Sequence, residues 1–280
     1  MSKLIIQRMS KEDITMAVNW AATEGWNPGL RDAECFYAAD PQGFFIGKLS
    51  GKPIAVGSAI AYNDRFAFCG FYIIKPAYRG QGYGMQLTQT LLDYAGNRII
   101  GIDGVLGMLN KYENIGFTVA HLNARYRSAG WYSFPVDKAI VDLCEVPFLD
   151  LLDYDKQYFP ASRSTFLTSW ITQTDCYSLA YLDKGKLSGY GVIKKCREGY
   201  KMGPLFSDSF AIADFLFRAL VTKAGEPPFY LDIPKSNKNA LQLVSKYKME
   251  EVFSTARMYR NGNPNLNLDN IYGITTFELG

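Results

Sequence analysis

The chain has 280 residues, of which 48% are hydrophobic and 20% are charged, and its formal net charge is +3 at pH 7. This hydrophobic fraction is sufficient for a packed core and excludes general disorder, and the length fits two domains or one large domain. Lysine and arginine form no continuous run of the kind that follows a phosphate backbone, so a nucleic acid is not expected as a partner.

Cysteine and histidine usage limits the chemistry further. The five cysteines are odd in number and show no metal-ligand or redox spacing, and the single histidine, His121, argues against a histidine-based metal site or a Ser-His-Asp triad. Charged residues from Lys3 to Glu12 interrupt any apolar leader, and no stretch is apolar enough to span a bilayer. We therefore expect a reduced, cytoplasmic protein that uses no metal and does not enter a membrane.

The first half of the chain alternates short strands and helices. Ser10 and Asp13 form a capping-box pattern before a helix with a periodic apolar face, and the turn residues at 27–29 end that helix. Strands are expected at 3–8, 44–49, 53–62, 66–74, 98–102 and from 117 onward, and helices at 10–25, 30–39, after Gly84, and at 105–114. The three strands between 44 and 74 have the turn spacing of an antiparallel meander.

The second half repeats this order of elements after a hinge expected at 128–138. Strands are expected at 139–145, 177–182, 187–195, 200–204, 229–233 and 252–259, helices at 147–158, 162–172, 210–223 and 237–247, and a candidate last strand at 274–279. A period of about half the chain indicates a duplicated fold. We therefore expect an α/β (α+β) fold with tandem domains, 1–130 and 138–280, each a mixed, mostly antiparallel twisted sheet flanked by helices.

The segment from Arg79 to Gly84, Arg-Gly-Gln-Gly-Tyr-Gly, lies between an expected strand and an expected helix. A helix start offers free backbone N–H groups and the positive end of the helix dipole, and glycines let an anion approach them. The loop therefore indicates a diphosphate site. It follows an antiparallel meander rather than the first strand of a βαβ unit, and it lacks Gly-Lys-Ser/Thr, which argues against a dinucleotide fold and a P-loop. The alternative is an ordinary glycine-rich turn.

The segment 74–84 resembles the pyrophosphate-binding motif of the GNAT superfamily of N-acetyltransferases, and Tyr112-Glu113-Asn114-Ile115-Gly116-Phe117 resembles a later motif of the same superfamily. The segments 24–29, 102–104, 232–234 and 257–259 resemble a bacterial subgroup with a second, GNAT-like C-terminal domain. The resemblance implies an acyltransferase that uses acetyl-CoA as co-substrate. It also implies direct attack by an amine of a small molecule or peptide within a ternary complex.

The resemblance further implies roles for individual residues. Backbone N–H groups of the loop would hold the CoA pyrophosphate, and the strand before the loop would pair with the pantetheine arm. Tyr112 would protonate the departing thiolate, since a phenol with a pKa near 10 suits that base; the alternative is a packed tyrosine at a helix–strand junction. The implied cofactor-binding residues are Tyr72, Ile73, Ile74, Arg79, Gly80, Gln81, Gly82, Tyr83, Gly84 and Met85.

The sequence departs from the family pattern at the general base. Many members carry a carboxylate on the strand before the loop, but residues 66–71 include no acid. Glu24 is the candidate for this general base. The alternatives are a chain of water molecules or an acceptor amine with a low pKa. Trp26 and Asn27 would line the acceptor cleft, unless they form only a turn, and the aromatic residues Tyr62 and Phe68 would join them, unless they are core. Cys69 fits a buried, inert thiol.

In the second half, residues 202–209 replace the glycine loop and include Asp208, which would repel a phosphate. This half is therefore expected not to bind CoA but to pack on the first and shape the acceptor cleft. The missing strand carboxylate and the degenerate second half leave one alternative function open, a non-catalytic sensor or scaffold for CoA or acyl-CoA. A longer acyl-CoA also remains an alternative donor, because the sequence does not determine the size of the acyl pocket. The sequence also leaves open whether the chain forms a homodimer.

Overall fold

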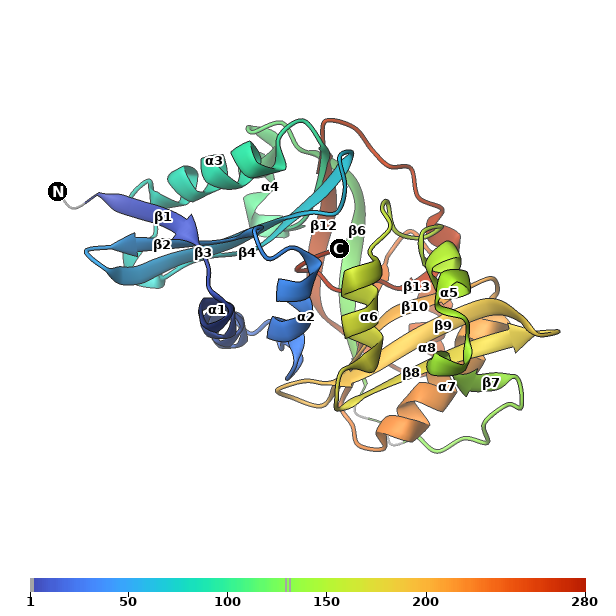
Figure 1. Cartoon of the computed structure of the whole chain (residues 1–280). Helices are drawn as coiled ribbons and strands as arrows, with labels where there is room; N and C mark the ends of the chain where they lie inside the picture. Colours follow the sequence, from blue (N-terminus) through green and yellow to red (C-terminus); the bar gives the residue numbers. More distant parts are fainter. Residues whose placement is uncertain (1–2, 129, 131) are drawn as a thin grey trace.

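The structure, a computed structural model, describes residues 3–128, 130 and 132–280 and contains one continuous sheet (Figure 1). The strands of the first half are β1 Leu4–Arg8, β2 Phe44–Leu49, β3 Lys52–Ala61, β4 Phe66–Ile74, β5 Ile99–Val105 and β6 Thr118–Ser128. Those of the second half are β7 Ile140–Asp142, β8 Cys176–Asp183, β9 Lys186–Lys195, β10 Tyr200–Ser207, β11 Phe229–Pro234, β12 Glu250–Arg260 and β13 Ile271–Gly273.

The helices follow the same duplicated order. In the first half they are α1 Lys11–Thr23, α2 Asp32–Ala39, α3 Tyr83–Ala95 and α4 Leu109–Glu113; in the second they are α5 Phe148–Asp155, α6 Ser164–Thr172, α7 Phe210–Ala224 and α8 Lys238–Lys246. Short 3-10 helices are η1 Pro76–Tyr78, η2 Leu106–Met108, η3 Leu143–Glu145 and η4 Leu268–Asn270. The predicted fold class, with mixed, mostly antiparallel strands and flanking helices in two repeated halves, is confirmed.

The two halves exchange their last strands. The sheet order is β1-β2-β3-β4-β5-β12-β6-β11-β10-β9-β8-β7, so that β12 pairs with β5 of the first half while β6 pairs with β11 of the second. Figure 1 shows β6 and β12 side by side between the two halves. The proposed boundaries at 130 and 138 therefore divide the chain in sequence, whereas in space residues 118–128 lie within the sheet of the second half.

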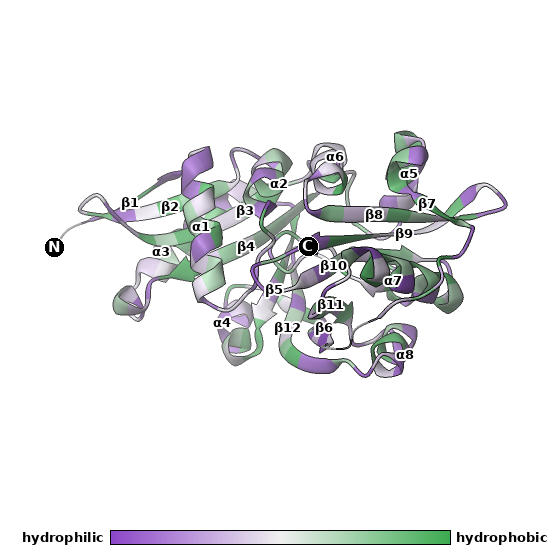
Figure 2. Cartoon of the chain, turned by 90° about the horizontal axis from the view of Figure 1, so that it is seen from below, coloured by the Kyte–Doolittle hydropathy of each residue, from purple (hydrophilic) through white to green (hydrophobic). Residues whose placement is uncertain are grey.

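One hydrophobic core extends across both halves. Helices α2, α5 and α6 lie on one side of the sheet, and α4 and α8 lie on the other (Figure 2). The rings of Phe36 on α2 and Trp170 on α6 stack with their centroids 6.2 Å apart, and both side chains are completely buried. Because this packing joins helices from different halves, burial of apolar surface stabilises the whole chain as one unit.

Several expected elements are confirmed with small shifts at their ends. The capping box at α1 forms: the Ser10 hydroxyl accepts from the Asp13 N–H, and the Asp13 carboxylate accepts from the Ser10 N–H. The expected strand at 139–145 is wrong beyond Asp142, where η3 begins, and the expected helix at 105–114 consists of η2 followed by the short α4. The expected last strand at 274–279 is also wrong, because the strand there is β13, which ends at Gly273.

The hinge expected at 128–138 includes Ala129 and Trp131, which lie outside the described residues; residues 130 and 132–137 form no helix or strand. Within the described ranges, no helix combines the length and hydrophobicity needed to cross a membrane. Likewise, no group of three or more His, Cys, Asp or Glu side chains in the described part of the chain is placed to hold a metal ion.

Candidate active site

The glycine loop opens α3 at the end of β4. Gly80 and Gly82 have φ angles of 77° and 83°, the left-handed region that favours glycine, and a Cβ atom at either position would meet nothing within 4 Å. In the described structure, no protein group accepts a hydrogen bond from the N–H groups of Gly80 through Met85. These donors lie at the positive end of a helix and are not used by the described protein, so they can bind an anion.

Arg79 has a different role from the glycines that follow it. Its backbone N–H donates to the Pro76 carbonyl at 3.2 Å, so the row of free donors begins at Gly80. Its guanidinium donates to the Ile74 carbonyl at 2.8 Å and binds the Glu24 carboxylate at 2.6 Å. Glu24 therefore lies beside the loop as the partner of Arg79, and this ion pair fixes where β4 turns into the loop.

Next to the loop, β4 separates from β5. The two parallel strands pair only through Phe66, Ala67 and Phe68, and beyond Phe68 no strand covers this edge of β4 in the described part of the chain. On the other edge, Ile73 and Ile74 stay paired with Val56 and Ala55 of β3. The split leaves a backbone edge at Tyr72–Ile74 next to the free amides of the loop, where an extended ligand could add as a further strand.

Two tyrosines lie beside this split. The Tyr112 ring packs on Gly104 of β5, where a Cβ would approach the ring to 2.8 Å. The Tyr72 hydroxyl accepts from Thr88 at 3.4 Å and packs on Gly84, where a Cβ would lie 2.5 Å from its oxygen. Burial raises the pKa of Tyr112 above its usual value of 10, while a hydrogen bond from the Val105 backbone acts in the opposite direction and nearby Tyr72 adds to the rise. Tyr112 is thus held in its protonated form.

The turn that follows α1 is held by the second half. Asn27, at a φ of 49°, donates to the Glu198 carbonyl and accepts from the Glu198 N–H, both at 2.9 Å. Lys201 donates to the Asn27 carbonyl at 3.1 Å, and the buried Lys194 ammonium pairs with Asp32 at the start of α2. These contacts favour a structural role for Asn27 over the predicted contact with an acceptor.

Of the three aromatic residues predicted to line the cleft, one lies at its border and two pack under the C-terminal segment. Trp26 packs edge-on against Phe71, next to the bend of β4, with ring centroids 6.2 Å apart. Tyr62 donates to the Leu279 carbonyl at 2.9 Å, and Phe68 is completely buried under Gly280 and Arg257. Trp26 thus borders the site, whereas Tyr62 and Phe68 support the segment 275–280. Cys69 is buried as expected, and burial raises the pKa of its thiol to about 12.

The equivalent position in the second half is closed in two ways. At the start of α7, Ser209 Oγ accepts from the Ile212 N–H, while the N–H groups of Asp208 and Ser209 donate to Ser188 and Ser207. The parallel pairing of β10 with β11 also ends early, at Met202, but here β13 fills the split by pairing with Leu205 and Phe206 of β10. The slot that stays open along Tyr72–Ile74 in the first half is therefore occupied by the chain itself in the second.

Sequence reasoning missed residues 275–280. Glu278 of this segment is buried at 3% exposure and lies against β4 at Gly70, where a Cβ would overlap the Glu278 carbonyl oxygen. The sequence around Glu278 has no helical or strand periodicity, so it does not indicate that this acid is buried against β4.

The duplicated α+β fold, the free amides at the start of α3 and the split beside them define an acyltransferase that uses an acyl-CoA. Residues 11–117 match the family described as "Acetyltransferase (GNAT) family", and residues 151–273 match "Acetyltransferase (GNAT) domain". Together the two matches cover most of the chain, which belongs to the GNAT superfamily and carries two GNAT domains.

Relatives of similar length support this assignment. The chain is 27% identical over 274 residues to holothin acyltransferase of Pseudoalteromonas sp. (strain SANK 73390), covering 97% of this chain and 92% of that protein. A crystal structure of a putative acetyltransferase from Pyrococcus horikoshii superposes with a TM-score of 0.84 at 24% identity, covering 99% of this chain and 96% of that one. A tandem GNAT protein from the clavulanic acid biosynthesis pathway superposes with a TM-score of 0.66 at 11% identity, covering 93% and 99%.

Proposed function

We propose that this enzyme transfers an acetyl group from acetyl-CoA directly to a primary amine of a small molecule. The observation that carries the proposal is the row of free N–H groups from Gly80 to Met85 beside the unpaired edge of β4. The amides would hold the pyrophosphate, and the edge at Tyr72–Ile74 would hold the pantetheine arm through backbone hydrogen bonds. This arrangement directs the thioester into the split between β4 and β5.

Tyr112 would serve as the acid for the departing thiolate. Its phenol lies at the split against Gly104, and its raised pKa keeps the proton available at neutral pH. In the proposed reaction the amine nitrogen forms a bond to the thioester carbon, the carbon–sulfur bond breaks, and the CoA sulfur receives the phenol proton. The nitrogen loses one proton as the amide forms, and this proton, passed through solvent, restores the phenol.

The acceptor is proposed to be a small amine because a relative that is similar over nearly the whole chain is named holothin acyltransferase, after its own acceptor. Trp26, beside the bend of β4 at Phe71, offers an indole face that suits an aromatic or cationic acceptor. Holothin therefore belongs in the test panel together with simple amines.

Two measurements test the proposal. Calorimetry should give binding of acetyl-CoA, and a thiol-trapping assay with a panel of tyramine, aniline, spermidine, amino acids, an N-terminal peptide and holothin should give thiol release that depends on one class of acceptor. Tight acetyl-CoA binding without acylation of any amine would instead support a CoA sensor. Absence of acetyl-CoA binding would contradict the proposal, because the proposed reaction requires that co-substrate.

A further inference from the structure

The strand position next to the bend of β4 is occupied by the backbone of another segment. Gly70 pairs with Ser58 of β3, and Phe71 after it has a φ of 52°, where β4 bulges. A side chain at Gly70 would overlap the Glu278 carbonyl oxygen. The structure therefore excludes an acid on β4 itself at this position, and an acidic residue of the segment 275–280 lies there instead.

The path of this segment is fixed from the second half. β13 fills the split beside β10, and the Ile274 N–H donates to the Asp232 carbonyl at 2.8 Å. Arg163, itself buried in a two-bond pair with Asp155, donates to the Thr275 hydroxyl at 2.9 Å. The segment is thus anchored in one half and crosses to β4 of the other, so the position of Glu278 is set by buried contacts.

One oxygen of the Glu278 carboxylate forms a hydrogen bond and the other does not, among the described residues. The Thr276 hydroxyl donates to Oε2 and accepts from the Glu278 N–H at 2.9 Å, whereas Oε1 has no hydrogen-bond partner among the described residues. Across the strand pair, the hydroxyl of Ser58 is buried and likewise lacks a partner in the described structure. The buried hydroxyl opposite Gly70 therefore lacks a donor or acceptor among the described residues.

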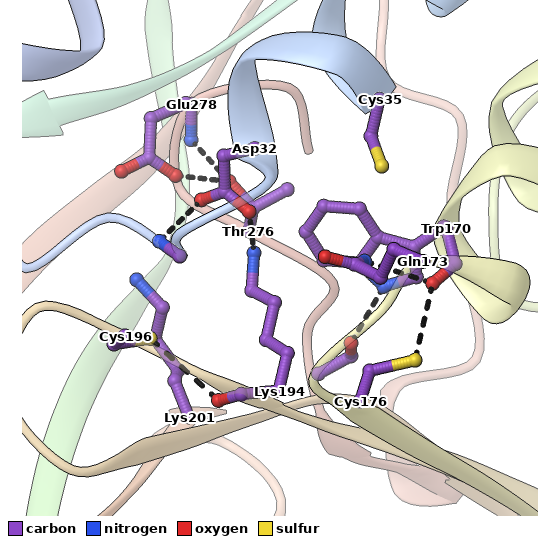
Figure 3. A network of polar contacts seen from close by, with 12 residues as sticks. Asp32, Cys35, Trp170, Gln173, Cys176, Lys194, Cys196, Lys201, Thr276 and Glu278 are labelled. Atoms are coloured by element: carbon purple, nitrogen blue, oxygen red, sulfur yellow. Dashed lines mark hydrogen bonds and ion pairs between the residues drawn. The ribbon is translucent and has the colours of Figure 1, made fainter.

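Figure 3 shows the Glu278 carboxylate bound to the Thr276 hydroxyl, and it also draws the pair that Lys194 forms with Asp32. Burial lowers the pKa of the Arg125 guanidinium on β6, but the negative charges of Asp232 and then Glu278 raise it, and the net shift is upward. Lys194 is paired with Asp32 and Arg125 with Asp232. Among the described residues, Arg125 of β6 is the charged group that interacts electrostatically with the Glu278 carboxylate. Because Asp32 and Asp232 are each bound in an ion pair, Glu278 is the acid of this region that has no cationic partner in an ion pair among the described residues.

We propose that Glu278 supplies, from the C-terminal segment, the carboxylate that β4 lacks and accepts a proton from the acceptor amine. The inference rests on the proposed function. An alkylammonium acceptor transfers one proton to Glu278 and becomes a neutral amine, which attacks the thioester carbon. The nitrogen loses its second proton as the amide forms, the thiolate takes the Tyr112 proton, and one proton leaves to solvent for each turnover. Glu24, paired with Arg79 beside the loop, does not serve this step.

The test compares two amines that differ in their need for a base. Tyramine is protonated at neutral pH and aniline is neutral, so only tyramine requires deprotonation before attack. Glu278→Gln is expected to lower kcat/KM for tyramine by about 10²–10³-fold at pH 7 but that for aniline by less than about 10-fold. Its acetyl-CoA affinity should equal that of the wild type, and its rate with tyramine should recover steadily as the pH rises towards the pKa of the amine.

Asp269→Asn is the matched control, because Asp269 is an exposed acid of the same C-terminal region; its rates should be unchanged. If Glu278→Gln does not fold, Glu278→Asp retains the charge on a shorter side chain, and a loss of activity with tyramine alone supports the same role. If the wild type acetylates tyramine and Glu278→Gln has the same rate and pH profile, the assignment of Glu278 fails while the proposed function stands. If the wild type acetylates no amine of the panel, both fail.

Discussion

Arg125 and Asp232 connect strands from opposite halves of the chain, because the Arg125 guanidinium donates hydrogen bonds of 2.7 and 2.8 Å to the two oxygens of the Asp232 carboxylate. Both side chains are buried, at 5% and 2% exposure. A third donor of Arg125 binds the Trp26 carbonyl at 2.7 Å. The exchanged strand β6 thereby joins the sheet of the second half to the turn that borders the candidate acceptor site.

Asp232→Ala is expected to destabilise the whole chain, because it leaves the Arg125 charge buried without its partner. Loss of one member of a buried pair costs about 3–5 kcal/mol. Lys235→Ala is the control, since its pair with Glu251 is solvent-exposed at 35% and 36% and such pairs contribute less than about 1 kcal/mol. Urea unfolding of both variants measures the difference, and equal midpoints would contradict a structural role for the Arg125–Asp232 pair.

Gly82→Asp is expected to abolish acetyl-CoA binding, because a carboxylate at this position would repel the pyrophosphate. Like charges in contact cost several kcal/mol, which corresponds to a dissociation constant raised at least about 10²-fold. Gly51→Asp is the matched control: Gly51 has a φ of 77°, a similar open surrounding and the same backbone strain, but it lies in the β2–β3 turn. Calorimetry that gives unchanged affinity for Gly82→Asp would remove the loop from the cofactor site.

Tyr112→Phe is expected to lower turnover by about 10²-fold, the range for loss of one general acid, with acetyl-CoA affinity nearly unchanged. Because burial raises the pKa of Tyr112 above 10, the phenol stays protonated at neutral pH, and its titration should not reduce the wild-type rate between pH 7 and 9. Tyr181→Phe on β8, far from the loop in sequence and in the opposite half, should leave kcat intact. An unaltered kcat for Tyr112→Phe would exclude Tyr112 as the acid.

His121 is expected to remain neutral in the folded protein down to acidic pH. Burial, followed by the positive charge of Arg257, lowers the pKa of its imidazole to about 3 from 6.5. The unfolded chain binds a proton below pH 6.5 and the folded chain does not, so the free energy of unfolding falls as the pH drops, by at most about 2 kcal/mol between pH 6.5 and 5.

Proton NMR can test this directly, because His121 is the single histidine of the chain and its ring signals need no assignment. No titration should occur between pH 8 and 5. His121→Gln should remove this part of the pH dependence of unfolding. A ring signal that titrates near pH 6.5 in the folded protein would show that the imidazole is accessible to protons.

Calorimetric titration is expected to give one acetyl-CoA site per chain. In the second half, β13 occupies the split beside β10, and the N–H groups at the start of α7 are bound by Ser188, Ser207 and Ser209. Gly82→Asp should therefore eliminate all binding rather than half of it. A residual site in that variant would mean that β13 leaves its slot.

Much of the fold follows from local patterns. The period of the apolar residues predicted most strands and helices, the Ser10–Asp13 pattern predicted the start of α1, and the glycines at 80, 82 and 84 predicted a helix start with free amides. Each of these signals lies within a few residues, because hydrogen bonds along a helix and alternation along a strand are set by neighbours in the chain.

Tertiary structure alone decided the pairing of β6 with β11 and of β12 with β5, the use of β13 to fill the second split, and the delivery of Glu278 to Gly70. A strand's sequence determines which face is apolar but not which distant edge it joins, since exchanged and unexchanged strands would bury similar surface. The sequence by itself therefore determined the glycine loop at the start of α3 and the duplicated order of elements. Contacts between residues more than a hundred positions apart decided which acidic side chain reaches the site.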